Sequence, residues 1–194
     1  MRKPAVFIDR DGTINEQMGY INHISRFVLL PGAAQAIRLL NRSNYLAIIV
    51  SNQSGVARGY FPIGLVDQVH ARMNRLLEME QAVFDGIFFC PHYPKGTVPE
   101  YSIECDCRKP GTGLIKKACE KFAIDMENSY VIGDRCSDIE LAHRANVQGI
   151  MVTTGYGRGD VEHVLPHSPF QPVHIAGDLL HAVRWILKKE KGNQ

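Results

Sequence analysis

Short apolar runs alternate with segments of helical periodicity along the whole chain, and this alternation restricts the possible folds more than any other feature. The apolar runs are rich in β-branched residues and show no polar alternation, so they predict strands buried on both faces. They occupy residues 5–8, 46–50, 87–89, 130–132 and 150–152, with a shorter one near 173–175. Residues spaced for helices lie between them, at 33–40, 65–76, 114–122 and 139–145. Because each return between parallel strands needs a crossover, the pattern predicts an α/β fold with a doubly wound parallel sheet.

The domain organisation is expected to be simple. A length of 194 residues suits one domain, and no repeat, linker or insertion large enough for a mobile cap interrupts residues 1–194. A last helix is expected over about 178–187, with Gly177 and Asp178 as its start signal and the lysine-rich tail outside it. Residues 155–172 are rich in glycine and proline and are expected to form an ordered surface connection.

Composition argues against nucleic acids and membranes as partners. Lys and Arg number 22 against 20 Asp and Glu, which gives a net charge of +2, and the only basic run is Lys188, Lys189 and Lys191. The apolar run at 5–8 is too short for a signal-peptide core, and no stretch approaches the roughly 18 apolar residues of a membrane helix. We therefore expect a soluble, cytoplasmic, monomeric protein whose partner is a small molecule.

Polar residues suited to phosphoryl transfer follow four predicted strands. The first strand runs into D-R-D-G-T, with Asp9 and Asp11, and the second ends in Ser51. Lys109 precedes the helix after the third strand, and the fourth ends in G-D-R with Asp134. Each residue alone is also compatible with a turn or a helix cap. The carboxyl ends of parallel strands meet at one edge of the sheet, where open α/β sheets bind ligands. Together, these residues supply the groups that phosphoryl transfer needs: a carboxylate nucleophile, an acid/base carboxylate, a metal-binding carboxylate, a hydroxyl and a lysine.

This ordered set, D-x-D-x-T followed by Ser, Lys and G-D after later strands, resembles the haloacid dehalogenase superfamily over nearly the whole chain. The resemblance implies the Rossmann-like fold of that superfamily. It also implies that Asp9 is a nucleophile that forms an aspartyl-phosphate. Asp11 would be the general acid for the leaving oxygen and then the base for water. Ser51 and Lys109 would hold the transferring phosphoryl oxygens.

The same resemblance implies a catalytic Mg²⁺ ion. Its ligands would be the Asp9 carboxylate, the backbone carbonyl of Asp11 and the Asp134 carboxylate, with Asp138 in support. Few carboxylates combined with phosphate oxygens and waters suit the octahedral shell of this ion.

A second metal is predicted in the loop 90–107, where Cys-x-His is followed after twelve residues by Cys-x-Cys. The ligands are Cys90, His92, Cys105 and Cys107. This set closes a tetrahedral structural Zn²⁺ site, and five cysteines without an export signal favour a metal over disulfides. The loop lacks the clustered basic and aromatic residues of nucleic-acid modules. Zinc there would fix the adjacent Arg108 and Lys109 over the substrate pocket.

The remaining cysteines and helical histidines receive no chemical role. Cys119 is expected to have a structural place on a helix face, and Cys136 is left unassigned. His70, His143 and His181 are expected at surface or internally satisfied positions.

The motifs C-P-H, C-D-C-R-K-P, S-N-Q-S-G-V-A-R-G and D-R-D-G-T-I-N resemble the family of D-glycero-D-manno-heptose 1,7-bisphosphate phosphatases. These enzymes remove the C7 phosphate during synthesis of the ADP-heptose precursor of lipopolysaccharide. The substrate-binding residues that the resemblance implies are Gln17, Met18, Gly19, Tyr20, Ser51, Asn52, Gln53, Ser54, Arg108, Lys109 and Arg135. Arg58, Arg108 and Arg135 are candidates for binding a second phosphate, because arginine forks bind phosphate bidentately.

Three alternatives stay open from the sequence. Histidinol-phosphate phosphatases share the zinc loop, and G-D-R in place of the frequent G-D-K weakens discrimination between the two substrates. A phosphotransferase or mutase could use the same aspartyl-phosphate, although a mutase needs a cap that excludes water. A catalytically idle, zinc-stabilised binding scaffold is the alternative of another class. The anomer preferred is left undecided.

Overall fold

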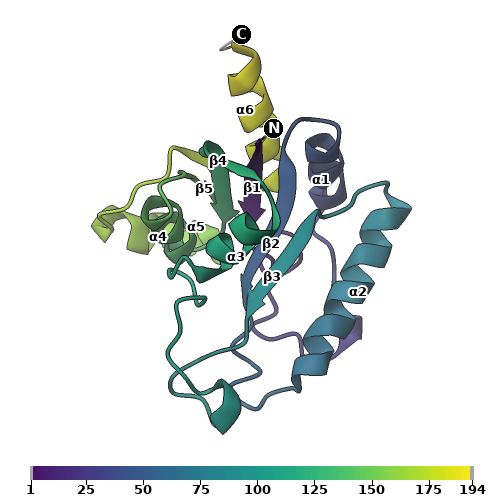
Figure 1. Ribbon diagram of the computed structural model, residues 1–194, viewed down its shortest axis with the longest axis vertical. Coiled ribbons are helices and arrows are strands. Elements are labelled where there is room, and N and C mark those ends of the chain that lie inside the picture. The colour runs from purple at the N-terminus through teal and green to yellow at the C-terminus, as the bar shows by residue number, and fades with distance from the viewer. Residues whose placement is uncertain (1, 193–194) are drawn as a thin grey trace.

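The fold is a parallel six-stranded sheet with helices on both faces, as the alternation of strand and helix patterns predicts (Figure 1). The computed structural model describes residues 2–192. Strand order is β3-β2-β1-β4-β5-β6, which places the first strand at the centre of the sheet. The strands are β1 (Lys3–Ile8), β2 (Leu46–Asn52), β3 (Gly86–Cys90), β4 (Ile124–Gly133), β5 (Gln148–Val152) and β6 (His174–Ala176).

Two apolar cores lie on opposite faces of the sheet, because successive side chains of a strand point to opposite sides. Val6 and Ile8 of β1 belong to one core, whereas Ala5 and Phe7 belong to the other. The first core is covered by α1 (Ala33–Asn41), α2 (Ile63–Met79) and α6 (Leu179–Gly192). The second core is covered by α3 (Gly113–Lys121) and α4 (Cys136–Arg144). Both faces of the central strands are therefore buried, as their continuous apolar runs predict.

One expectation from the sequence is wrong in detail, and the structure adds detail to two others. The last helix continues through Gly192, since Lys189 Nζ donates to Gln148 Oε1 at 2.8 Å and lies 5.2 Å from the Trp185 ring centroid. The connection after β5 is ordered, as expected, and contains consecutive helical turns, α5 (Gly157–Gly159), η3 (Asp160–Val164) and η4 (Leu165–His167). Cys119 lies on a helix, α3, as expected, and its side chain is exposed.

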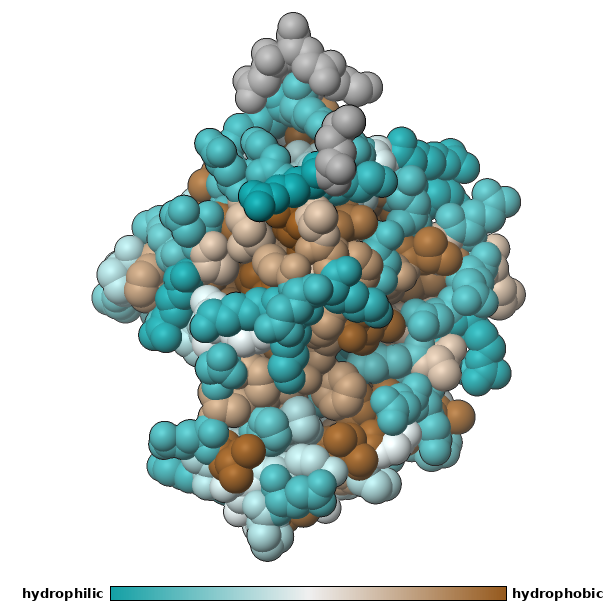
Figure 2. Space-filling view, in the orientation of Figure 1, coloured by the Kyte–Doolittle hydropathy of each residue, from teal (hydrophilic) through white to brown (hydrophobic). Residues whose placement is uncertain are grey.

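The carboxyl ends of the strands meet at one end of the molecule, opposite the start of β1 and the end of α6 (Figure 1). The long loops after β1 and β3 lie at this end and carry short 3₁₀ turns, η1 (Ile24–Arg26) and η2 (Pro99–Tyr101). The face drawn in Figure 2 is hydrophilic at its rim and more apolar toward its centre. Among the described helices none combines the length and hydropathy needed to cross a bilayer.

Candidate active site

A pocket of about 360 Å³ opens at the carboxyl edge of the sheet. Its wall combines residues from the ends of β1, β2 and β4 with the loop that precedes α3. The lining residues are Asp9, Asp11, Gln17, Gly19, Tyr20, Asn52, Ser54, Arg108, Lys109, Asp134, Arg135, Ser137, Asp138 and Tyr156. The structure thus brings together the carboxylates and the lysine that the sequence places after three separate strands.

Lys109 lies at the centre of the buried charges. Its Nζ is 2.5 Å from Asp9 Oδ1 and 2.7 Å from Asp138 Oδ1, and it also donates to the Val50 carbonyl at 2.9 Å. Burial alone would lower the pKa of the Lys109 ammonium, but the carboxylates of Asp138 and Asp9 raise it above its ordinary value. Lys109 is therefore a permanent cation in contact with Asp9.

Three buried carboxylates, from Asp9, Asp134 and Asp138, lie close enough to share a metal ion. Among residues 2–192, Lys109 is the one cation that pairs with these carboxylates, so an excess of negative charge remains, and Asp134 Oδ1 is buried without a hydrogen-bond partner there. Burial raises the pKa of Asp134 to about 8 and that of Asp9 to about 6, which shows the cost of ionising both in the protein alone. This donor set fits a hard divalent cation, which would remove that cost.

Two glycines make room for the Asp134 carboxylate. Gly12 and Gly155 have positive φ angles of 91° and 56°, which side-chain-bearing residues rarely adopt. A Cβ atom on either glycine would collide with Asp134 Oδ2. The same oxygen accepts a hydrogen bond of 2.8 Å from the backbone N–H of Tyr156. The loops after β1 and β5 thereby fix Oδ2 of Asp134, whereas its Oδ1 is buried and accepts no hydrogen bond from the described residues.

The Asp11 carboxylate is held by three donors. Arg10 Nη2 donates to Oδ1 at 2.8 Å and to Oδ2 at 2.7 Å, Asn15 Nδ2 donates to Oδ1 at 3.0 Å, and Gln53 Nε2 donates to Oδ2 at 2.8 Å. Burial would raise the pKa of Asp11, but Arg10 and these hydrogen bonds lower it below its ordinary range. Asp9 and Asp11, two residues apart in sequence, thus have carboxyl groups whose pKa values shift in opposite directions.

The loop after β1 contributes Gln17, Gly19 and Tyr20 to the wall, and β2 contributes Asn52 with the following Ser54. Three other residues predicted to bind substrate lie behind or beside that wall. Met18 lines a neighbouring hollow of about 390 Å³ with Tyr60. Ser51 and Gln53 are buried, and Gln53 Nε2 donates to Ser51 Oγ at 2.8 Å.

The three candidate arginines are placed differently. Arg108 and Arg135 line the pocket, whereas Arg58 lies outside its wall with its guanidinium 3.8 Å from the Tyr93 ring centroid. Arg108 Nη1 donates to the backbone carbonyl of His92 at 3.3 Å. Arg135 lies 4.6 Å from the ring centroid of Tyr156. Two of the three arginines thus face the space that a substrate would fill.

Sequence reasoning did not single out several residues that shape the site. Arg10 and Asn15 are buried and hold Asp11, and Asp160 accepts from Arg135 Nε at 3.3 Å and from Cys136 N at 2.7 Å. His70, expected only at a satisfied helical position, contacts Arg10. Arg10 and Asn15 lie within the motif D-R-D-G-T-I-N, so their closeness in sequence to both aspartates could have predicted a place in the site. No local sequence pattern links residues 70 or 160 to the site.

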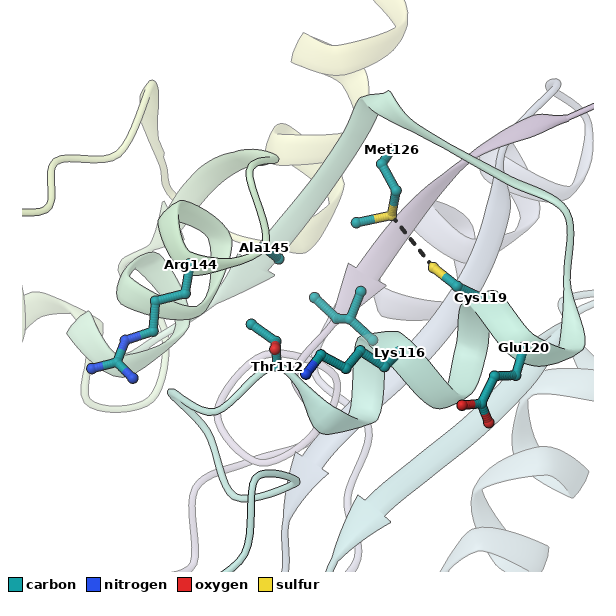
Figure 3. Close-up of a pocket in the computed structure, with 8 residues that line it drawn as sticks. Thr112, Lys116, Cys119, Glu120, Met126, Arg144 and Ala145 are labelled. Carbon is teal, nitrogen blue, oxygen red and sulfur yellow. Dashed lines mark hydrogen bonds between the residues drawn. The ribbon is translucent and has the colours of Figure 1, made fainter.

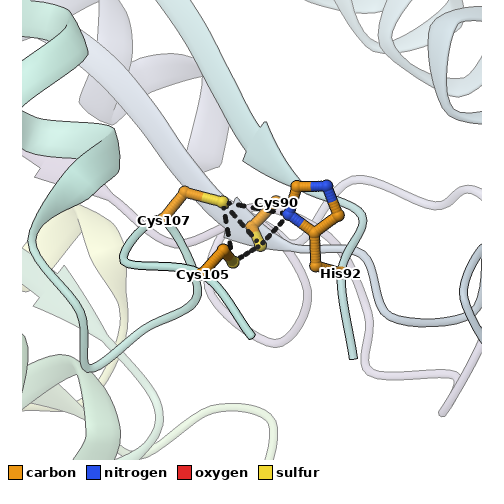
Figure 4. A group of neighbouring side chains, drawn as sticks. All are labelled: Cys90, His92, Cys105 and Cys107. Carbon is orange, nitrogen blue, oxygen red and sulfur yellow. Dashed lines mark hydrogen bonds between the residues drawn. The ribbon is translucent and has the colours of Figure 1, made fainter. Parts of the chain in front are cut away.

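The predicted zinc ligands form a compact group between β3 and the segment before α3 (Figure 4). The Sγ atoms lie 2.9 Å apart for Cys90 and Cys107, 3.1 Å for Cys105 and Cys107, and 3.5 Å for Cys90 and Cys105. His92 Nδ1 is 3.4 Å from Cys107 Sγ and 3.7 Å from Cys90 Sγ. These separations exceed the disulfide length of about 2.05 Å and approach the roughly 3.5–3.8 Å edges of a tetrahedral zinc shell.

A second cavity, of about 540 Å³, lies between α3 and α4 and contains none of the predicted site residues (Figure 3). Its floor is largely apolar, and Cys119 Sγ lies 3.6 Å from Met126 Sδ within it. Lys116, Glu120 and Arg144 supply the charged groups at its wall. It lacks the buried carboxylates of the first pocket, so the chemistry belongs to the carboxyl edge of the sheet.

Fold and site together define a phosphohydrolase of the haloacid dehalogenase type, and comparison with known proteins agrees. A family model described as "HAD-hyrolase-like" matches residues 106–182. A D-glycero-D-manno-heptose-1,7-bisphosphate 7-phosphatase of Thermosynechococcus vestitus is 41% identical over 190 residues, which cover 96% of each chain. The D-glycero-beta-D-manno-heptose-1,7-bisphosphate 7-phosphatase of Escherichia coli K12 is 40% identical over 153 residues, covering 78% of this chain and 80% of that protein.

A solved structure gives the same assignment. The D,D-heptose 1,7-bisphosphate phosphatase of B. bronchiseptica, crystallised with magnesium and phosphate, aligns with a TM-score of 0.83 at 28% identity, covering 96% of this chain and 99% of that one. The chain therefore belongs to the family of D-glycero-D-manno-heptose-1,7-bisphosphate 7-phosphatases, within the haloacid dehalogenase-like hydrolases.

Proposed function

We propose that this protein is a Mg²⁺-dependent phosphatase that removes the C7 phosphate of D-glycero-D-manno-heptose 1,7-bisphosphate, in synthesis of the ADP-heptose precursor of lipopolysaccharide. The observation that carries the proposal is the pairing of Asp9 with Lys109 at 2.5 Å, inside a pocket whose wall also holds Asp11 and Asp134. The names of the relatives at 41% and 40% identity support the substrate.

In the first step a carboxylate oxygen of Asp9 attacks the phosphorus of the C7 phosphate. The bond between phosphorus and the sugar oxygen breaks, and its electron pair stays on that oxygen, which receives a proton from the Asp11 carboxyl group. The pKa of Asp11 is lowered in the free protein, and the negative charge of the bound phosphate is proposed to raise it so that the group carries this proton. Lys109, fixed between Asp9 and Asp138, is placed to neutralise charge on the phosphoryl oxygens while it moves to Asp9. Ser51, turned toward Gln53 here, is proposed as a further donor to the phosphoryl group.

In the second step water attacks the aspartyl-phosphate. Asp11 accepts a proton from that water, the bond between phosphorus and Asp9 breaks, and inorganic phosphate leaves. A bound Mg²⁺ would keep the Asp9 and Asp134 carboxylates ionised and neutralise charge on the phosphate oxygens. Its proposed ligands are Asp9, the backbone carbonyl of Asp11 and Asp134, with Asp138 beside them.

Zinc is proposed as a structural ion that organises the segment before α3. Cys107 is followed directly by Arg108 and Lys109, and Arg108 also donates to the carbonyl of the ligand His92. A zinc ion held by both ends of the loop 90–107 would therefore restrict both cations at the pocket wall. The thiolates that such a site needs persist in a reducing compartment, which supports a cytoplasmic location. The protein is also proposed to be a monomer.

A second phosphate on the substrate fits the cations at the pocket wall. Arg108 and Arg135 both line the pocket. Within the described part of the chain, Arg135 pairs with Asp160 and Arg108 pairs with no carboxylate. Histidinol phosphate has a single phosphate and would leave one of these arginines without an anion. The assembled carboxylates also argue against an idle scaffold.

The test is Mg²⁺-dependent phosphate release from the α and β anomers of the heptose 1,7-bisphosphate and from histidinol phosphate, each at the same low concentration. The proposal predicts strong preference for the bisphosphate, with the β anomer favoured as in the names of several relatives. Preference for histidinol phosphate would overturn the substrate, and no release from any of the three would overturn the phosphatase proposal.

A further inference from the structure

Arg10 is buried between the two aspartates of the D-R-D motif and touches neither the pocket nor bulk water. Its side chain is 2% exposed, and it is absent from the residues that line the pocket. Nη2 donates to both oxygens of Asp11, and to Gln53 Oε1 at 3.1 Å, while Nε reaches Asp11 Oδ1 at 3.3 Å. A guanidinium held in this way fixes the plane of the carboxylate as well as its position.

His70 holds the far side of the Arg10 guanidinium. It lies on α2, and its Nε2 is 3.3 Å from Arg10 Nη1. Because a guanidinium has no acceptor, Nε2 must accept this hydrogen bond, which requires a neutral imidazole with its proton on Nδ1. Burial and the charge of Arg10 keep the ring neutral, since they lower the pKa of His70 to about 3. The ring also packs edge-on against Phe89 of β3 at a centroid distance of 5.5 Å.

We propose that His70 and Arg10 are positioning residues that aim the Asp11 carboxyl group at the oxygen of the leaving group. The chain of contacts runs from α2 through His70 to Arg10 and then to Asp11, so a helix outside the pocket determines the orientation of the acid/base group. This inference rests on the proposed function, because it assigns these residues to the proton transfer in which Asp11 protonates the departing sugar oxygen.

The role requires no contact between these two residues and substrate. His70 and Arg10 are both absent from the pocket wall, so neither can donate to a phosphate or to the sugar directly. Gln53 and Asn15 supply further bonds to Asp11, but Arg10 is the donor that engages both of its oxygens. Loss of the His70 acceptor frees Nη1 and permits the guanidinium, and the carboxylate with it, to rotate.

Substrates with different leaving groups can distinguish a positioning role of His70 and Arg10 from a general structural role. A sugar alkoxide must be protonated as it leaves, whereas p-nitrophenolate leaves without a proton from the enzyme. If the Asp11 carboxyl group is wrongly oriented, the aspartyl-phosphate therefore forms more slowly from the heptose bisphosphate. The rate at which it forms from p-nitrophenyl phosphate is unaffected. The ratio of the two kcat/KM values isolates this step, since kcat/KM does not include the later attack by water.

The experiment compares His70→Phe, which fills the volume without an acceptor, with His70→Gln, whose Oε1 can accept from Arg10. We expect His70→Phe to lower kcat/KM for the heptose bisphosphate about 10- to 100-fold. We expect kcat/KM for p-nitrophenyl phosphate to change less than about threefold. His70→Gln should restore most of the lost selectivity. Arg10→Lys, which keeps the charge but loses the fork, should show the same selective loss if His70→Phe folds poorly.

His143→Phe is the matched control, because His143 lies on α4 and bonds the carbonyl of Gln171 at the surface. It should leave both substrates unchanged. Equal loss of both activities in His70→Phe and Arg10→Lys would overturn the inference, and so would unchanged kinetics in both. The proposed function is tested separately by the wild-type rates, because the inference depends only on the ratio between variants.

Discussion

Asn52 and Lys109 bind each other through two hydrogen bonds: Asn52 Oδ1 accepts from the Lys109 backbone N–H at 3.0 Å, and Asn52 Nδ2 donates to the Lys109 carbonyl at 3.2 Å. Asn52 ends β2, and Lys109 follows the loop 90–107 by two residues. This pair fastens the segment after the loop to the sheet. The ammonium of Lys109 then reaches Asp9 from a backbone that is anchored on both of its polar groups.

Replacing Asn52 by Ala should therefore impair Lys109 without removing it. The substitution leaves a backbone donor and an acceptor unpaired, which costs about 1–3 kcal/mol of unfolding free energy. We also expect kcat to fall by about tenfold, because small misplacements at a reacting centre are costly. Urea denaturation and steady-state kinetics measure the two effects. Wild-type stability together with wild-type kcat would show that the pair has no positioning role.

Zinc removal should act on the pocket through the same segment. Cys107→Ser removes one of the four proposed zinc ligands, so bound zinc measured by atomic absorption should fall, KM should rise and kcat should fall. Cys119→Ser is the matched control, since Cys119 is exposed on α3 outside the ligand group. Unchanged zinc content and kinetics in Cys107→Ser would contradict the proposed role of the loop 90–107.

Arg108 should distinguish a bisphosphate from a monophosphate. Arg108→Ala removes a charge-assisted hydrogen bond worth about 1.5–3 kcal/mol, which corresponds to at least a tenfold rise in KM for the bisphosphate. KM for heptose 7-phosphate should change little, because that compound lacks the second phosphate. Arg158→Ala, at an exposed position outside the pocket wall, serves as control. Equal effects on both substrates would place Arg108 at the reacting phosphate instead.

The buried His70 should make stability depend on pH in a defined direction. Its pKa is about 3 in the folded protein and about 6.5 in the unfolded chain, so the unfolded chain binds more protons between these values. The contribution of neutral His70 is therefore fully present above about pH 6.5 and is lost as pH falls toward about 3. At pH 5 the loss is about 2 kcal/mol.

His70→Gln removes this titration, so its unfolding free energy should vary less between pH 7 and pH 4 than that of the wild type. Chemical denaturation at several pH values gives the two profiles. Parallel profiles would mean that His70 titrates alike in the folded and unfolded states, in conflict with its burial beside Arg10.

The parts of the fold that the sequence predicts are those set by local pattern. The strands β1 and β2 are continuous apolar runs, and α1 and α3 carry apolar residues at helical spacing. The end of α6 was missed because its stabilising contacts, from Lys189 to Gln148 and Trp185, include a partner that is distant in sequence.

In the site, too, local sequence pattern predicts some residues, and contacts between distant segments determine the others. Asp9, Asp11 and Asp134 follow strands directly, so the rule that parallel strands end at one edge is enough to bring them together. The support of Asp11 by His70 through Arg10 depends on how α2 packs, and nothing in residues 63–79 marks one histidine as different from the other polar residues. Contacts between elements, rather than patterns within them, decide such roles.

The proposed nucleophilic role of Asp9 is tested most directly by trapping the proposed covalent intermediate. The wild-type enzyme is mixed with heptose 1,7-bisphosphate carrying radiolabelled phosphorus at C7, quenched with acid within milliseconds and digested for peptide mapping. We predict label on the peptide that contains Asp9 and none in Asp9→Asn, which should keep its fold and its zinc. Absence of labelled protein in the wild type under burst conditions, or label and turnover that persist in Asp9→Asn, would contradict the proposed mechanism.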